Sequence, residues 1–555
     1  MNKSRLGFKK RYLYLPLFCI GLPMSAHAYV YNAPSGWMVS LNTNVGYSLG
    51  IRADKMNGKI GNNPSFQEQE WKHPNAGDIT NNRFDVSTEL NINYNNEYGI
   101  DASVSGWKDF AYNGGIVNNP DPAIAAYASA PDGHYPSFTN HYYNLGAELG
   151  NAYIYANTAI DQMPLSIKIG RFVEYWGTAL FSGAQAISYG QEPLDFVKAL
   201  NAPGSEVKTL FLPRNQISIH LQPSAAWTLG FQYQLEWRPY NLPQGGTWLS
   251  FGDPFFNGPQ RMGVGPYTYF DKGKDSTPPQ VNGNFGVEAL YSPLWLNGTA
   301  GLYFRQFDDP APYAAFTLYN VGNQVYYHSA FAQHTRLYGA SLEHSLGPVA
   351  ATIESSIRTN TALLTASGFT NAGGTDGARG NIWNVVADGM YTLTPNMLWD
   401  TGSLVGEIGY SHLLGVTHGK QWYKADKSPV CAAQVDGCAT NNEANFNIAF
   451  DPQWLGVIQN VNIDMPVNLN VGFWGGGQTL MTTSDGYQAG TLSYSAGIHA
   501  LIKQKYNIQL MYSGYSSPTS GVTKGPGGKT IYAGGNGAWF WNDQSRILLT
   551  MSTAF

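Results

Sequence analysis

Long stretches of this chain place apolar and polar residues at alternate positions. In the clearest stretch, 227–237, Trp, Leu, Phe, Tyr, Leu and Trp occupy every second position, and Thr, Gly, Gln, Gln and Glu lie between them. A period of two belongs to a β-strand whose two faces meet different surroundings. The same alternation returns at 37–51, 84–94, 349–358, 383–393, 404–412, 467–473 and 506–512. A half-buried soluble sandwich also alternates in this way, so other features must decide between a sandwich and a membrane barrel.

The composition favours the barrel. Charged residues make up only 12% of the 555 residues, about half of the roughly 25% that is usual in soluble domains. The mean hydropathy of -0.25 excludes a protein with several apolar helical spans. An outer-membrane β-barrel combines low charge with moderate hydropathy, because each strand shows apolar residues to lipid and polar residues to an aqueous lumen.

The first residues predict export. Five basic residues between 3 and 11 precede an apolar stretch at 12–24 and the small-residue site Ala26-His27-Ala28. This order is typical of a cleavable signal peptide, here residues 1–28, and leaves 29–555 as a single barrel domain. Its removal changes the formal charge from -5 to -10, which argues against nucleic acid as a partner. We expect the mature protein in the outer membrane of a Gram-negative cell, in contact with its lipid.

The connections between the expected strands fall into two classes. Tight joints rich in Pro, Asn and Lys lie near 95–96, 222–224, 292–293, 347–348, 394–396 and 503–505. Long connections lie at 52–81, 111–144, 239–283, 307–334, 359–380, 414–444 and 516–537. Short turns at one end and long loops at the other are typical of an outer-membrane barrel. This succession of strands, short turns and long loops predicts an all-β transmembrane antiparallel barrel of about 18 strands, with 16 as the alternative.

The chain ends on an alternating stretch, 547–555, whose last residue is Phe555. This terminus resembles the signal that barrel-assembly machinery reads, an alternating strand with an aromatic carboxy-terminal residue. The sequence therefore predicts barrel-assembly machinery as a partner.

Residues 173–215 are richer in apolar and charged residues than an ordinary exposed loop. They predict a plug that folds into the lumen, with a short helix beginning at Pro193 and reaching Leu200. Gly170-Arg171, Trp176-Gly177, Pro203-Gly204-x-Glu206-x-Lys208 and Leu212-Pro213 together resemble the signature of DUF1302, a proteobacterial family of outer-membrane proteins of unknown function. The resemblance implies a porin-like barrel. It also implies traffic in hydrophobic or lipid-like compounds, with a periplasmic or inner-membrane export component as a further partner.

Charged and aromatic residues of this segment and of polar strand positions form the candidate plug and lumen site. We expect Arg171, Glu206 and Lys208 to organise the plug, and opposite charges across the lumen to constrict the pore. An equally good interpretation is that these residues only hold the plug in place. The candidate residues are Arg171, Trp176, Glu192, Asp195, Lys198, Glu206, Lys208, Glu236, Arg238, Glu288, Arg305, Glu354 and Arg358.

Two further features lie in the long connections. Cys431 and Cys438 predict a disulfide that closes a small loop, since two ligands alone make a poor zinc site. Aromatic residues crowd 240–270 and 313–327, where they either form a greasy entrance for a hydrophobic molecule or pack the loops over the barrel mouth.

Enzymatic chemistry has little support. The sequence holds no G-x-S-x-G elbow, no H-E-x-x-H and no Gly-rich phosphate loop, so no catalytic residue, metal or cofactor is expected. The pairs Ser411-His412 and His344-Ser345 fail as lipase dyads, because neighbours on a strand point to opposite faces.

The sequence thus predicts a channel or transporter for a hydrophobic or amphipathic small molecule. A structural or adhesive surface barrel and a general porin for hydrophilic solutes are the alternatives.

Overall fold

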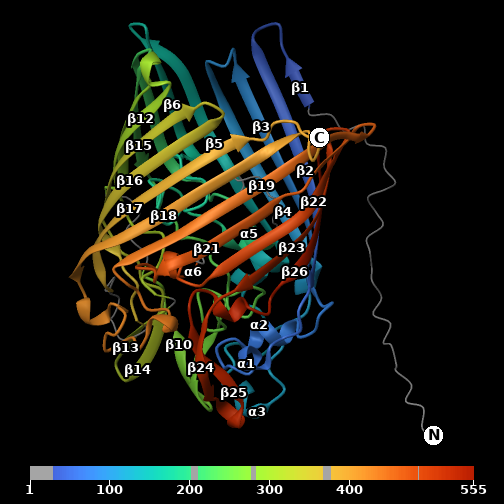
Figure 1. The fold of residues 1–555 in the computed structure, drawn as a ribbon, viewed down its shortest axis with the longest axis vertical. Coiled ribbons are helices and arrows are strands. Elements are labelled where there is room, and N and C mark those ends of the chain that lie inside the picture. Colours follow the sequence, from blue (N-terminus) through green and yellow to red (C-terminus); the bar gives the residue numbers. More distant parts are fainter. Residues whose placement is uncertain (1–28, 202–209, 277–282, 315, 367–376, 485–486) are drawn as a thin grey trace.

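The computed structural model describes residues 29–201, 210–276, 283–314, 316–366, 377–484 and 487–555. One antiparallel sheet of 18 wall strands closes on itself, because β26 pairs with β2 from Ala554 opposite Asn44 to Arg546 opposite Arg52 (Figure 1). The prediction of about 18 strands is confirmed, and the alternative of 16 is wrong. The wall strands are β2 (Trp37–Arg52), β3 (Ile79–Tyr94), β4 (Tyr98–Asp109), β5 (Leu145–Ile160), β6 (Met163–Phe172), β7 (Arg214–Ser224), β8 (Trp227–Gln234), β11 (Phe285–Tyr291), β12 (Gly298–Phe307), β15 (Thr335–Leu346), β16 (Val349–Ala362), β17 (Arg379–Thr392), β18 (Thr401–His418), β19 (Asn442–Ile458), β21 (Val467–Gly475), β22 (Leu492–Ile502), β23 (Tyr506–Ser516) and β26 (Arg546–Ala554).

The remaining elements are short. Two strands extend the wall sheet, β1 (Tyr29–Asn32) beside β2 and β20 (Val461–Asp464) ahead of β21. The others lie in long connections: β9 (Arg261–Gly265), β10 (Thr268–Lys272), β13 (Thr317–Val321), β14 (Gln324–His328), β24 (Thr519–Lys524), β25 (Thr530–Gly535), α1 (Gly58–Gly61), α2 (Gln67–Lys72), α3 (Pro122–Ala125), α4 (Ser137–Thr139), α5 (Phe196–Asn201) and α6 (Leu480–Ser484). None of the helices within the described ranges is long and apolar enough to cross a membrane.

The alternation of the sequence sorts each strand into two faces. In β8, Trp227, Leu229 and Phe231 are exposed on the outer face, while Gln232 and Gln234 are buried inside the barrel. An apolar outer surface over a polar interior is the inverse of a soluble protein and is the architecture of an outer-membrane barrel.

Short turns and long loops lie at opposite ends of the wall (Figure 1). Asn95 and Asn96 both have a positive φ, 48° and 59°, as a two-residue hairpin turn of the favoured hand requires. β1 and the carboxy terminus lie at the end with the short turns (Figure 1). The connection 476–491, between β21 and β22, is a further long one that the sequence analysis did not identify.

One predicted turn is displaced. β7 continues to Ser224, so the turn lies at 225–226 and not at 222–224. The pairing of β7 with β8 shifts register between Leu221 and Ser224. Pro223 lies within this irregularity, where a residue without a main-chain N–H removes no ladder hydrogen bond.

The largest apolar cluster joins the long loops to the segment that enters the barrel. Trp248, Phe251 and Phe256 are buried together with the residues 539–541 and with Ile187 of the inward segment. The aromatic residues of 240–256 therefore pack the loops over the barrel mouth, which is the second of the two interpretations offered by the sequence. Tyr267, further along the same connection, is not packed in this way, since 78% of its surface is exposed.

Candidate channel and its plug

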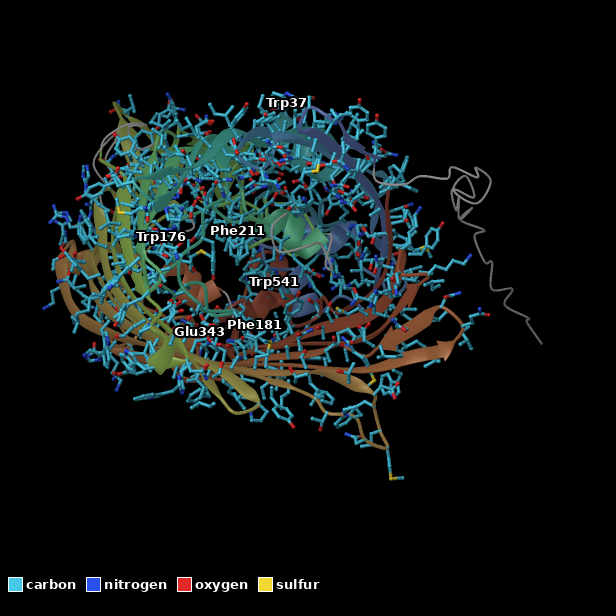
Figure 2. The ribbon with its side chains drawn as sticks, turned by 90° about the horizontal axis from the view of Figure 1, so that it is seen from above. Trp37, Trp176, Phe181, Phe211, Glu343 and Trp541 are labelled. Atoms are coloured by element: carbon cyan, nitrogen blue, oxygen red, sulfur yellow. A yellow bond between two sulfur atoms is a disulfide. The ribbon has the colours of Figure 1, made fainter. Side chains whose placement is uncertain are left out.

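The connection between β6 and β7 folds into the barrel, as predicted. Figure 2 looks along the barrel and shows Trp176, Phe181 and Phe211 of this connection inside the ring of strands. We call residues 173–201 and 210–213, the described part of this connection, the plug. The helix expected from Pro193 begins instead at Phe196, because the side chain of Asp195 accepts a hydrogen bond of 2.9 Å from the amide of Lys198 and so caps it.

Two wall carboxylates hold the first half of the plug by its main chain. Glu354, on β16, accepts hydrogen bonds from the amides of Thr178, Ala179 (3.1 Å) and Ile187 (2.8 Å). Glu407, on β18, accepts from the amides of residues 180–182 at 2.5–3.1 Å. Both carboxylates are buried. Several N–H donors on one carboxylate replace the water that burial removes, and at the same time satisfy the amides of a non-helical buried segment.

Two wall arginines hold the next part of the plug. Arg305, on β12, donates to the carbonyl oxygens of Ile187 and, at 2.7 Å, Tyr189. The guanidinium of Arg358, on β16, lies 3.9 Å from the centre of the Tyr189 ring. The Tyr189 hydroxyl in turn donates to Asp309 at 2.5 Å. The plug is therefore fixed by wall side chains of both signs.

The second half of the plug is tied to the strand that follows it. Glu192 accepts hydrogen bonds from the amide of Glu174 at 3.0 Å and from the Gln216 side chain at 2.8 Å, and lies 3.2 Å from Nε of Arg214. These contacts close the plug into a loop whose two ends meet. Trp176 is buried in the cluster shared with the outer loops.

Other candidate residues lie elsewhere. Glu236 and Arg238 were expected on a strand but follow the end of β8, and pair with Arg171 (3.2 Å) and Glu148 (2.8 Å). Arg171 therefore bridges strand ends, although we expected it to organise the plug. Glu288 lies 3.4 Å from His220 on the wall. Lys198 lies on α5. Glu206 and Lys208 lie outside the described residues.

The sequence analysis missed several residues that contact the plug. Glu407 is the main one, and Glu443 accepts a 3.1 Å hydrogen bond from the side chain of Gln185. Asn445 and Asn447 donate to the Ser182 hydroxyl at 3.1 and 3.2 Å. Glu407, Glu443 and both asparagines occupy the polar parity of their strands, so the rule that selected Glu354 identifies them too when applied to every strand.

A cavity of about 360 Å³ lies between strands β3 to β6 and the plug. Its lining combines aromatic side chains with charges of both signs, and includes Trp107, Tyr153, Phe172, Phe211, Glu89, Glu148, Lys168 and Lys198. Its volume falls within the range of small-molecule sites, and its mixed lining suits an amphipathic molecule better than a purely polar or purely apolar one.

The structure also places the two cysteines, the Ser411-His412 pair and the residues that could bind a metal. Cys431 and Cys438 form the predicted disulfide, in the connection between β18 and β19. His412 shares a 2.8 Å contact with Asn442, while Ser411 donates to Asn384 at 2.9 Å, so this pair is separated. Within the described ranges, no group of three or more His, Cys, Asp and Glu residues is placed to hold a metal ion.

Solved structures with a similar course are bacterial outer-membrane proteins. OccK9 (OpdG) of Pseudomonas aeruginosa is 8% identical, with a TM-score of 0.44 over 93% of this chain and 98% of that one. OccK1 (OpdK) of the same organism is 9% identical, with a TM-score of 0.41 over 93% and 98%. The outer membrane channel DcaP of Acinetobacter baumannii is 9% identical, with a TM-score of 0.37 over 95% and 99%. No curated protein matches the sequence significantly.

The family comparison covers almost the whole chain. Residues 10–555 match the family described as "Protein of unknown function (DUF1302)", the family that the motifs between Arg171 and Pro213 resemble. The protein is thus a porin-like barrel that belongs to the DUF1302 family.

Proposed function

We propose that this protein is an outer-membrane channel that passes an amphipathic or hydrophobic small molecule through its plugged lumen. The cavity of about 360 Å³ beside the plug carries the proposal, because its lining offers both aromatic surface and charge. A structural barrel has no need of such a cavity. A general porin for hydrophilic solutes needs an open polar passage, whereas here the plug crosses the barrel and is fixed by Glu354 and Glu407.

The proposal also includes a partner that sets the direction of transport and a signal peptide that directs export of the protein. Handover to or from a periplasmic or inner-membrane export component would supply the direction of transport. Cleavage after Ala28 would leave Tyr29 as the first residue of the mature protein, which sequencing of its amino terminus tests.

Planar-bilayer conductance and dye uptake distinguish the candidates. We expect low conductance, together with entry of anilinonaphthalene sulfonate into albumin-loaded vesicles that contain the full-length protein. A large steady conductance with swelling of the vesicles in arabinose would establish a general porin. Absence of conductance and of dye entry, with the plug in place and with residues 180–205 deleted, would establish a filled structural barrel and overturn the proposal.

A further inference from the structure

The barrel wall has a seam between β5 and β6. β5 runs from Leu145 to Ile160, but its pairing with β6 covers only Ala152 to Ile160. Residues 145–149 pair with β4 on their other side, and 150–151 lie at a register shift of that pairing. Within the described ranges no strand pairs with 145–151 on the β6 side. Over these seven residues, the hydrogen-bonded ladder that joins β5 to β6 further along the strands is missing.

Side chains bridge this seam where main-chain pairing is missing. Nε of Arg171 donates to the carbonyl oxygen of Leu149 at 3.2 Å, and Nη2 of Arg238 lies 2.8 Å from Oε1 of Glu148. Arg171 also pairs with Glu236 at 3.2 Å. Bare strand edges are not tolerated against lipid, which explains why polar side chains cover this one.

The side-chain contacts across the seam are weaker than a ladder of main-chain hydrogen bonds between two strands. The Arg171, Arg238, Glu148 and Glu236 side chains are 15–25% exposed, so water reaches these ion pairs and can replace their partners when they separate. Rotamer changes alone separate them. By contrast, parting two paired strands breaks a row of main-chain hydrogen bonds and leaves their N–H and C=O groups unsatisfied against lipid.

The outer side of the seam faces lipid. The apolar side chains beside it are Leu145, Leu149, Ile169 and Leu235, and 64%, 52%, 43% and 38% of their surfaces are exposed. They continue the apolar band of the barrel past the seam. A molecule that leaves the seam therefore enters the membrane and not the aqueous medium.

The inner side of the seam faces the cavity described above. Glu148 and Leu149 of β5 line it, as do Phe172, Phe211 and Pro213 on the other side. Lys168 lies deeper on β6, with Nζ 5.8 Å from the ring centres of Tyr153 and Phe172. In the part of the chain that the structure describes, Lys168 forms no ion pair, so its charge is free to meet an anionic group.

We propose that the seam is a lateral gate that connects the cavity with the lipid. Its ligand is a single-chain amphipath with an anionic head group, whose head lies at Lys168 and whose chain lies against Phe172 and Phe211 toward the seam. Opening requires that Arg171 release the Leu149 carbonyl and that Arg171 and Arg238 separate from Glu148. The gate rests on the proposed function, since it names the side from which the channel is loaded or emptied.

Photolabelling from the membrane tests the gate. Full-length protein is reconstituted in vesicles that contain dodecanoate with a diazirine at the end of its chain, and labelled peptides are identified by mass spectrometry. We expect label on the peptides that contain Phe172 and Phe211. Joining Glu148→Cys to Arg238→Cys with a short bismaleimide should reduce this label to the level without irradiation, while the same unlinked variant retains it.

A matched pair on the same two strands provides the control. Asn157 and Ser166 lie opposite each other in the paired part of β5 and β6, with a 2.8 Å hydrogen bond between their side chains. Linking Asn157→Cys to Ser166→Cys should leave the cavity label unchanged. Equal cavity label with the Glu148/Arg238 pair linked and unlinked, or equal loss in both linked pairs, would overturn the gate.

The head-group site has its own test. Lys168→Gln should reduce labelling by the carboxylate probe about tenfold, because a hydrogen bond to a charged group is worth about 1.5–3 kcal/mol. It should not change labelling by the methyl ester of the same probe, and Lys168→Arg should retain the label. Equal effects on acid and ester would refute this ligand class. Dye uptake and conductance are measured on the same samples, so a sealed seam in a working channel is distinguishable from an inactive barrel.

Discussion

The carboxylate of Glu407 on strand β18 accepts a 2.6 Å hydrogen bond from the main-chain amide of Leu180 in the plug. The amides of Phe181 and Ser182 donate to the same carboxylate at 3.1 and 2.5 Å. Glu354 binds the amides on either side of this turn in the same way. The position of the plug is therefore decided by a few wall side chains, which can be replaced without altering a strand.

Neutralising Glu407 should loosen the plug. A glutamine retains one acceptor oxygen but loses the charge, and hydrogen bonds to charged groups contribute about 1.5–3 kcal/mol. Glu407→Gln should increase the frequency of open events in single-channel recordings, and Glu407→Gln with Glu354→Gln should increase it further. Glu343→Gln is the control, because Glu343 is an exposed carboxylate on β15 that, within the described residues, forms no hydrogen bond with the plug. Unchanged recordings in the double variant would show that these carboxylates do not hold the plug.

Truncating Trp248 should destabilise the packed loops. Trp248 is 1% exposed, and its removal leaves a cavity of the kind that costs about 3–5 kcal/mol in protein cores. We expect Trp248→Ala to speed proteolysis of the loops while the heat-dependent gel shift of the barrel persists. Tyr267→Ala, at a position 78% exposed, should remain within about 0.5 kcal/mol of the parent. Similar proteolysis of both variants would contradict the packing role.

The packing of the long loops over the barrel mouth should become less stable as pH rises. Burial raises the pKa of Glu68 to about 7 from its ordinary 4.5, and burial followed by the Glu68 charge raises that of Asp253. A carboxyl whose pKa is higher in the folded state binds its proton more tightly there, so its contribution is complete below pH 4.5 and is lost as pH rises through 7. The protection of amides 58–72 from hydrogen exchange, expressed relative to the intrinsic exchange rate at each pH, should be greater at pH 5 than at pH 8.

Glu68→Gln should remove part of that dependence on pH. The amide is neutral throughout, and its oxygen can still accept the hydrogen bond that Glu68 now takes from the Ala130 amide at 2.9 Å. The dependence of protection on pH that remains in this variant is then due to Asp253. Protection that increases with pH in the parent protein would have the wrong sign for buried, protonated carboxyls.

The terminal residue should affect assembly more than stability. The main chain of Phe555 exchanges hydrogen bonds of 2.7 and 2.9 Å with Thr43, and its ring lies 4.8 Å from Nζ of Lys505. Phe555→Ala retains the main-chain bonds but removes the aromatic end. We expect a lower yield of folded barrel in membranes with an unchanged unfolding midpoint for the fraction that assembles, and recovery in Phe555→Tyr. An unchanged yield would show that the aromatic ring is not read.

The seam and the two carboxylates that hold the plug differ in how well the sequence predicts them. Glu354 and Glu407 follow from strand parity, because period two fixes which face a residue takes. The seam does not, since 145–151 alternate like any paired stretch and only the shorter β6 leaves them without a partner. Likewise Glu236 and Arg238 continue the alternation of 227–237 in sequence, yet both follow the end of the strand, and Arg238 bridges the seam to Glu148.

By itself the sequence determined the barrel, its approximate strand number, the segregation of turns and loops, the inward plug and the disulfide. Each of these depends on local pattern: alternation selects the faces, Pro and Asn mark the turns, and two nearby cysteines have one partner each. Only the tertiary structure decided which carboxylates meet the plug amides and where the ladder stops. The contacts between wall carboxylates and plug amides join residues more than 150 positions apart, such as Glu407 and Leu180, and they depend on the register and tilt of the closed wall.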